Sequence, residues 1–175
     1  MSDYRAFDQL RTNELTIVKN GFWYPAYELT DGQFVYGQLS YRANFKRDGV
    51  IETAQGTWTI KRKGWFKRSY DLNQNEDETI GTLIPETWVR DVNLKMDSGF
   101  EATYQYKRAF SRSLVLTHDT LGDILQITAK LFNFKRPYTV TLEQVKQPDN
   151  MPPILLLALT GLNIILIRQQ KAAAS

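Results

Sequence analysis

The sequence predicts an all-β protein: a closed antiparallel barrel of about twelve strands that encloses a C-terminal hydrophobic α-helix. From Glu14 to Lys146, short segments in which apolar and polar residues alternate recur at a spacing of roughly 8–12 residues, as in sandwiches and barrels. From Ile154 to Ile167 the alternation stops, and 11 of 14 residues are strongly apolar. We therefore expect residues 1–175 to form a single domain, with strands over about 14–146 and a central helix over about 152–169.

Turn pairs and alternating apolar positions define the predicted strands. Asn20-Gly21, Asp31-Gly32, Asp48-Gly49 and Ser98-Gly99 are dipeptides typical of tight turns between antiparallel strands. Between the turns, aromatic and β-branched residues recur at every second position, which is the pattern of a half-buried strand. After a first strand that begins at Glu14, we expect strands over 23–29, 33–41, 50–51, 56–62, 65–72, 78–84, 87–96, 100–108, 114–117, 123–130 and 138–143.

The alternation also assigns side chains to faces, because successive strand residues point to opposite sides of a sheet. Arg90 falls on the same expected face as Val92 and Leu94. If that face points inward, Arg90 would need a buried partner, such as Asn163 or a carbonyl at the end of the helix. A bulge that turns Arg90 outward is the alternative. The expected sets are Phe34 with Tyr36, Gln38 and Ser40, opposite Val35, Leu39 and Tyr41; Trp58 with Ile60; Phe66 with Tyr70 and Leu72; Ile80 with Ile84; Trp88 with Arg90, Val92, Leu94 and Met96; and Phe100 with Ala102, Tyr104 and Tyr106.

The apolar run after the strands predicts a helix that is buried on every side. Met151-Pro152-Pro153 can open it, because proline suits the first turn, and only Thr160, Gly161 and Asn163 interrupt it. A helix that is apolar all round lies inside protein or inside a membrane. A bilayer span needs about 20 apolar residues, so the shorter run favours burial in protein. The alternative is a tail anchor in which residues 151–168 span the bilayer.

The size of the barrel also favours an enclosed helix. Twelve strands spaced ~4.8 Å apart and tilted by ~40° form a barrel with a backbone diameter of about 24 Å. Inward side chains leave a hole of roughly 12 Å, which matches the ~10–12 Å diameter of an α-helix with its side chains. Eight strands can fill their own interior, whereas twelve cannot. The apolar helix is therefore the natural filling of this barrel.

Composition excludes many classes of enzyme. The chain has no Cys, which excludes a thiol nucleophile and Cys-ligated zinc, and its single His excludes sites with two imidazoles. We expect no metal and no cofactor. The net charge of +3 fits contact with phosphates or anionic lipid, but it is too small for a dedicated nucleic-acid binder. The first ten residues lack the apolar run of a secretory signal, so we expect a cytoplasmic protein.

The predicted architecture resembles the tubby C-terminal-like superfamily, which includes tubby proteins, phospholipid scramblases and LURP-one-related proteins. The resemblance covers about residues 14–170 and rests on the strand number, the helix PPILLLALTGLNIILIR and the segment GTWTIKRKGWFKRSYDL. It implies a barrel around a central helix and weakly implies an activity on membrane lipids. The chain lacks the Cys-rich stretch of scramblases, and the segment before its helix, LEQVKQPDNM, lacks their cluster of carboxylates.

The basic segment KRKGWFKR, residues 61–68, is the most distinctive candidate site. Gly64 predicts a hairpin turn, which would place cations of both strands on one rim with aromatic residues at the tip. Such a rim suits an anionic phospholipid head group, since cations attract phosphate and Trp favours the head-group boundary. The alternative is a solvated hairpin that Glu76-Asp77-Glu78 partly neutralises. The candidate ligand-binding residues are Lys61, Arg62, Lys63, Trp65, Lys67 and Arg68.

Other basic groups and the single histidine are weaker candidates. Lys107, Arg108 and Arg112 form a second basic set, and Lys135 with Arg136 forms a third. His118-Asp119 lies in THDTLGD, which has the composition of a turn, so we do not expect a catalytic pair there.

The sequence predicts a non-enzymatic binding or scaffold domain of tubby-like type. Its expected ligand is an anionic phospholipid head group or a protein partner at the basic rim, which would make it peripheral to a membrane. An enzyme that uses scattered carboxylates is the remaining alternative, although their spacing indicates no paired-acid geometry.

Overall fold

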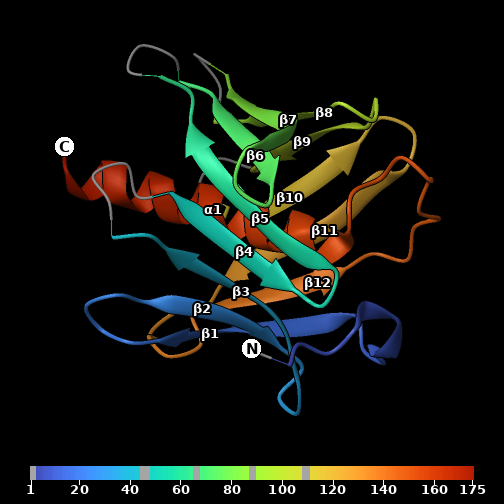
Figure 1. Cartoon of the computed structure of the whole chain (residues 1–175). Coiled ribbons are helices and arrows are strands. Elements are labelled where there is room, and N and C mark those ends of the chain that lie inside the picture. Colours follow the sequence, from blue (N-terminus) through green and yellow to red (C-terminus); the bar gives the residue numbers. More distant parts are fainter. Residues whose placement is uncertain (1–2, 44–47, 65–67, 87–89, 108–110) are drawn as a thin grey trace.

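The computed structural model describes residues 3–43, 48–64, 68–86, 90–107 and 111–175. Within these residues, twelve strands form a closed barrel in which every neighbouring pair is antiparallel (Figure 1). The predicted fold class is therefore confirmed. The strands are β1 (Glu14–Asn20), β2 (Ala26–Thr30), β3 (Val35–Tyr41), β4 (Gly49–Thr53), β5 (Gly56–Arg62), β6 (Tyr70–Gln74), β7 (Glu78–Pro85), β8 (Val92–Met96), β9 (Glu101–Gln105), β10 (Ser113–His118), β11 (Gly122–Ala129) and β12 (Tyr138–Leu142).

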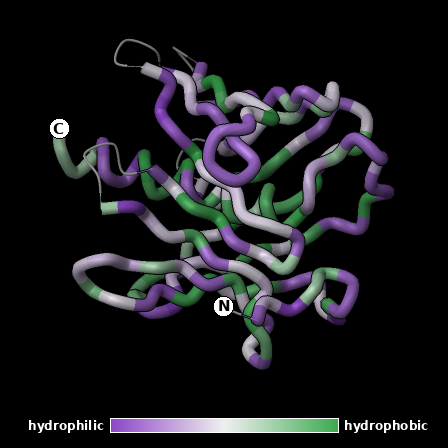
Figure 2. The backbone as a smooth tube through the Cα atoms, viewed as in Figure 1, coloured by the Kyte–Doolittle hydropathy of each residue, from purple (hydrophilic) through white to green (hydrophobic). Residues whose placement is uncertain are grey.

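Strand order follows chain order around the whole wall. Each strand pairs with the strands before and after it, and β1 closes the barrel by pairing with β12, with Leu15 opposite Val140. Hydrophobic and hydrophilic residues alternate along the strands (Figure 2), and the hydrophobic set faces inward. This closure brings the segments around β1 and β12 together although they are far apart in the sequence.

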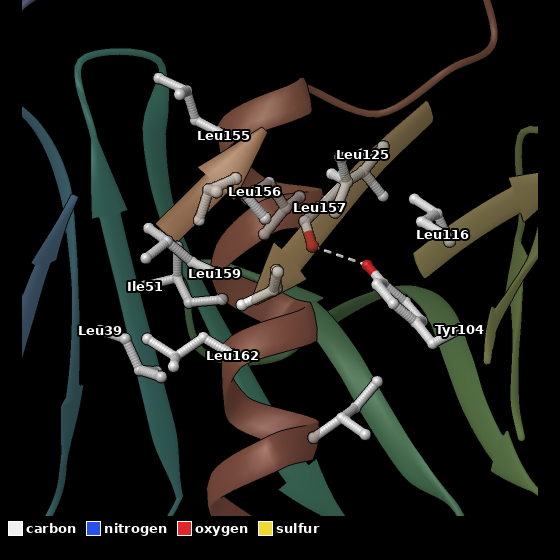
Figure 3. Packing of buried hydrophobic residues seen from close by; sticks show 14 of the residues in the cluster. Leu39, Ile51, Tyr104, Leu116, Leu125, Leu155, Leu156, Leu157, Leu159 and Leu162 are labelled. Carbon is white, nitrogen blue, oxygen red and sulfur yellow. Dashed lines mark hydrogen bonds between the residues drawn. The ribbon is translucent and has the colours of Figure 1, made fainter. Parts of the chain in front are cut away.

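The helix α1 (Ile154–Ala173) fills the barrel and is longer than the expected 152–169 at its C-terminal end. All residues from Ile154 to Leu166 are buried, which explains why the run has no polar face. By length and composition α1 could cross a membrane, yet 72% of its most apolar 18-residue window is buried inside the barrel. Figure 3 shows Leu159 and Leu162 directed toward Ile51 and Leu39 of the wall.

Among the described residues, two tyrosines of the wall donate hydrogen bonds to the helix. The Tyr104 hydroxyl donates to the Leu157 carbonyl over 2.7 Å (Figure 3), and the Tyr41 hydroxyl donates to Asn163 Oδ1 over 2.7 Å. Asn163 therefore has a buried partner in Tyr41. Arg90 is exposed in a bend before β8, so it needs no partner in the interior.

Several expected sets of inward side chains are buried together. They are Trp58 with Ile60, Val92 with Leu94 and Met96, and Phe100 with Ala102 and Tyr104.

Two bulges change the expected faces elsewhere. In β3, a register shift opposite Leu29 and Thr30 leaves Tyr36 as an extra residue, so Tyr36 and Leu39 are both buried. In β7, a shift at Ile80 turns Gly81 and Leu83 inward and leaves Ile84 39% exposed, so the shared face expected for Ile80 and Ile84 was wrong.

The strands alternate in direction, so their ends gather at two ends of the barrel. Odd-numbered strands finish, and even-numbered strands begin, at the end where α1 leaves the barrel. There Gln169 Nε2 donates to the Tyr138 hydroxyl over 2.8 Å, and the Arg168 guanidinium lies 5.2 Å from the Tyr106 ring centroid. We call this the helix-exit end.

Candidate functional site at the helix-exit end

The basic segment forms a hairpin at the helix-exit end, as its sequence predicts. Arg62 pairs with Tyr70 across β5 and β6, and the Lys63 amide donates to the Ser69 carbonyl over 2.9 Å. Gly64 has a φ of +68°, the left-handed conformation that favours glycine in a turn. Trp65 and Lys67 lie outside the described residues.

Carboxylates and carbonyls already contact two of its cations. Lys61 Nζ donates to the Glu76 carbonyl over 2.6 Å and lies 3.5 Å from Asp77 Oδ1. Lys63 Nζ lies 3.5 Å from Asp71 Oδ1. The hairpin is thus partly neutralised, and Arg62 and Arg68 are its exposed cations without an ion pair among the described residues.

These contacts form because the turn between β6 and β7 folds back over the outer face of β5. Asn75 has a φ of +54°, its amide donates to the Thr57 carbonyl over 2.8 Å, and its carbonyl accepts from the Thr59 hydroxyl over 3.1 Å. Glu76 then reaches Arg42, whose Nη2 lies 2.6 Å from Glu76 Oε1. The result is a surface cavity of about 420 Å³ that cations and carboxylates line together.

A second surface at this end carries most of the exposed apolar side chains. Seven large apolar side chains are exposed in the described part of the chain, and six of them lie in two loops, 21–25 and 130–137. Soluble surfaces seldom gather apolar side chains in this way unless they bind something. We call the six the aromatic surface: Phe22 (83% exposed), Trp23 (84%), Tyr24 (79%), Leu131 (58%), Phe132 (89%) and Phe134 (85%).

The two loops lie side by side because β1 pairs with β12. The Lys19 amide donates to the Lys135 carbonyl over 2.8 Å and so joins loop 130–137 to the end of β1, just before loop 21–25 begins. Within the longer loop, the Arg136 amide donates to Asn133 Oδ1 over 2.8 Å. Phe132 has a φ of +56°, which a bulky residue rarely adopts, and its side chain is held out in solvent.

Positive charge surrounds the aromatic surface. Residues 19–27 and 129–138 contain four cations and no Asp or Glu, and none of the four is in an ion pair with another described residue. The cations are Lys19, Lys130, Lys135 and Arg136. The aromatic surface therefore combines exposed apolar side chains with a positive potential. In the 420 Å³ cavity beside Lys61, by contrast, carboxylates lie among the cations.

A cavity of about 330 Å³ opens behind the longer loop. Lys19 and Lys130 contribute the charged groups among its lining residues, and Phe132 and Phe134 belong both to the cavity and to the aromatic surface. Burial raises the pKa of Tyr27 and of Tyr138, so both phenols keep their protons at neutral pH. The lining comprises Lys19, Tyr27, Ala129, Lys130, Phe132, Asn133, Phe134, Pro137, Tyr138, Leu166 and Gln169.

A smaller cavity of about 180 Å³ lies between α1 and the strands β7 and β8. Asn163, Arg90, Asp91 and Arg168 are among its lining residues. Burial raises the pKa of the Asp91 carboxyl, and Arg168 Nη1 is buried without a hydrogen-bond partner among the described residues. Much of the rest of its lining is apolar and comes from Ile164, Ile167, Leu83 and Val92.

The second basic set and the histidine have local partners. Lys107 pairs with Asp123, Arg112 is exposed, and Arg108 lies outside the described residues. His118 Nδ1 accepts from the Thr120 amide over 3.2 Å, and its ring stacks on Phe100 with centroids 5.2 Å apart. The segment is a turn, as expected.

Comparison with known proteins identifies no relative. No family model, no curated protein and no solved structure matches the chain. The barrel and its surfaces are therefore the basis for a functional conclusion.

The aromatic surface was not predicted from the sequence. Trp23 was expected in a strand, whereas β2 begins at Ala26 and Trp23 is exposed in the turn. Lys135 and Arg136 were expected to form a basic pair, without a connection to Phe132 and Phe134. The available signal was two turn segments, GFWYP and KLFNFKRP, that are rich in aromatic residues and lack carboxylates.

Proposed function

We propose that this protein is a non-enzymatic, tubby-like binding domain that docks its helix-exit end on an anionic membrane surface. The aromatic surface carries the proposal: six exposed apolar side chains on two adjoining loops, surrounded by four cations. In this arrangement the protein is peripheral to the cytoplasmic face of a membrane, where anionic lipids gather.

The two kinds of side chain act on different parts of a bilayer. Tryptophan, tyrosine and phenylalanine favour the boundary between head groups and acyl chains, where an apolar ring and a polar atom can both be accommodated. Lysine and arginine near an anionic surface contribute about 1 kcal/mol each. Trp23 with Phe132 and Phe134 would enter the boundary while Lys135 and Arg136 remain among the head groups.

The basic hairpin has a secondary role in this proposal. Arg62 and Arg68 are exposed at the same end and add to its positive potential. Lys61 and Lys63 are held by Glu76, Asp77 and Asp71, so changing them would disturb the outer face of β5 as well as any ligand. Arg62 and Arg68 are therefore the better positions for testing the hairpin.

Co-sedimentation with vesicles tests the proposal. Wild-type protein should bind vesicles of phosphatidylcholine with phosphatidylserine, and added salt should weaken the binding because exposed charges are screened. Replacing Trp23, Phe132 and Phe134 with Ser should weaken it at least about tenfold, since burial of each ring stabilises by roughly 1.5–3 kcal/mol when complete. The change Lys135→Gln with Arg136→Gln removes two cations and should weaken it by about 30-fold.

Two control variants locate the surface. Ile84→Ser removes an exposed apolar side chain near the end of β7, across the barrel from β1 and β12, and should leave binding unchanged. Arg62→Gln with Arg68→Gln removes the same charge from the hairpin and should have the smaller effect. The proposal is wrong if wild-type protein does not bind the vesicles. It is also wrong if the variant of Arg62 and Arg68 loses binding while the variant of Trp23, Phe132 and Phe134 keeps it. If wild-type protein does not bind the vesicles but is retained by an immobilised protein partner, the surface is assigned to protein binding.

A further inference from the structure

The 330 Å³ cavity behind loop 130–137 is lined by residues of several strands and of the helix. Lys19 comes from the end of β1, Tyr27 from β2, Tyr138 from the start of β12, and Leu166 with Gln169 from the last turns of α1. Closure of the barrel between β1 and β12 sets the positions of these strands, and the Lys19–Lys135 backbone hydrogen bond fixes the loop over them. The cavity is therefore part of the folded framework.

Its polar groups suit an anion. Among the residues that line it, two are lysines and none is a carboxylate. The Tyr138 hydroxyl accepts a hydrogen bond from Gln169 Nε2 over 2.8 Å, which leaves its own proton available to donate. Tyr27 is a second phenol in the lining. Ammonium and phenol groups both donate hydrogen bonds, so the complementary ligand carries several anionic acceptor oxygens.

Its size and position suit a phosphate-bearing group. A volume of about 330 Å³ is near the lower limit of small-molecule sites, which range over about 300–1,000 Å³, so the cavity can hold a head group but not a whole lipid. Phe132 and Phe134 line it and also belong to the aromatic surface. A membrane docked on that surface would present its phosphates at the mouth of the cavity.

We propose that this cavity binds the phosphate group of a phosphate ester, with Lys19 and Lys130 as its cations and Tyr138 as a neutral donor. The inference rests on the proposed membrane function for its biological setting, because the same chemistry is found in a lipid head group and in a soluble phosphate ester. The binding itself can be measured without a membrane.

Titration with soluble probes tests the site. Amide chemical shifts of the full chain are followed during addition of dihexanoyl phosphatidic acid, glycerol 3-phosphate or inorganic phosphate. We expect saturable shifts at residues of loop 130–137 and at Gln169, and little change around Lys61. Tighter binding of the lipid than of glycerol 3-phosphate assigns the site to head groups, whereas equal binding assigns it to soluble esters. Either result supports the phosphate site.

Charge-matched variants separate the cavity from its surroundings. Lys19→Gln with Lys130→Gln should weaken probe binding at least tenfold, whereas Lys135→Gln with Arg136→Gln, outside the cavity lining, should weaken it less than threefold. Tyr138→Phe should weaken it without removing charge. Lys130 is exposed, so Lys130→Gln alone keeps the test valid if the double variant fails to fold.

Two results overturn the inference. One is the absence of saturable shifts with all three probes. The other is an equal loss of affinity in the lining and outer double variants, which would indicate a diffuse surface potential. If either result is found while the wild-type protein still binds vesicles, the proposed membrane function stands and the phosphate site is removed.

Discussion

Tyr41 and Tyr104 both hydrogen-bond to α1, but removal of their hydroxyls leaves different groups behind. The Leu157 carbonyl that accepts from Tyr104 belongs to the helix interior, where it also has the ordinary intrahelical partner. The Asn163 side chain is 1% exposed, and its Oδ1 accepts from Tyr41. Loss of the only donor to a buried acceptor costs more free energy than loss of one of the two donors to a carbonyl.

We therefore expect Tyr41→Phe to be the more destabilising of two matched substitutions. Tyr104→Phe should lower the free energy of unfolding by about 0.5–1.5 kcal/mol, and Tyr41→Phe by about 1–3 kcal/mol. Urea unfolding followed by circular dichroism measures both. The reverse order would mean that water or a side-chain rearrangement satisfies Asn163 in the variant.

Single-residue predictions from the sequence succeeded where the strand was regular. Trp58 and Ile60 are buried together because β5 pairs with β4 and β6 without a shift in register. Tyr36 and Ile84 were misplaced because a bulge inserts one residue and reverses the faces that follow it. A bulge depends on the partner strand, so alternation within one segment does not reveal it.

At the scale of elements, Gly161 controls how closely the helix approaches the wall. A Cβ added there would lie 2.7 Å from Ile127 Cδ1 and 3.0 Å from Tyr104 Cε1, closer than packed atoms allow. Glycine usually weakens a helix relative to alanine by about 1 kcal/mol. Here its small size lets α1 pack against β9 and β11.

Gly161→Val should therefore destabilise the fold despite removing a glycine from a helix. Overpacking of a buried site typically costs about 1–3 kcal/mol, which outweighs the gain in helix propensity. Ala172→Val, in the exposed last turn, is the matched control and should change stability by less than about 1 kcal/mol. Similar melting temperatures for the two variants would show that the wall yields around position 161.

The existence of the strands and of α1 could be predicted from local patterns, whereas the aromatic surface could not. Its two loops are separated by most of the chain, and they meet only because β1 pairs with β12. The same limit applies to Lys61, whose contact with Glu76 depends on a turn folded back over β5. Local sequence identifies such loops as turns but does not indicate which turns become neighbours.

For the whole molecule, the helix supplies the interior that the strands cannot fill. Nine Leu and Ile side chains of α1 are buried within the barrel: Ile154, Leu155, Leu156, Leu157, Leu159, Leu162, Ile164, Ile165 and Leu166. Full burial of such a side chain stabilises by roughly 1.5–3 kcal/mol, so the nine together exceed a typical net stability of about 5–15 kcal/mol. We therefore expect the barrel to be stable only with its helix.

Ending the chain after Gln147 should leave a molten or insoluble product. Calorimetry and near-ultraviolet circular dichroism should show no cooperative transition, because the inner faces of the strands lose their contacts. Ending it after Gln170 removes only exposed residues and should leave the melting temperature within a few degrees. A cooperative melt of the shorter product near that of the full chain would contradict the packing described above.

The order of the elements along the chain also has a consequence for synthesis. Each strand meets its next neighbour through a short connection, so pairing of the wall can begin while translation continues. The helix follows all twelve described strands, and at about 5–20 residues per second its 20 residues take about 1–4 s to make. Until then the inward apolar side chains have no helix to cover them. The nascent chain therefore exposes its largest apolar area to chaperones and to other unfinished chains.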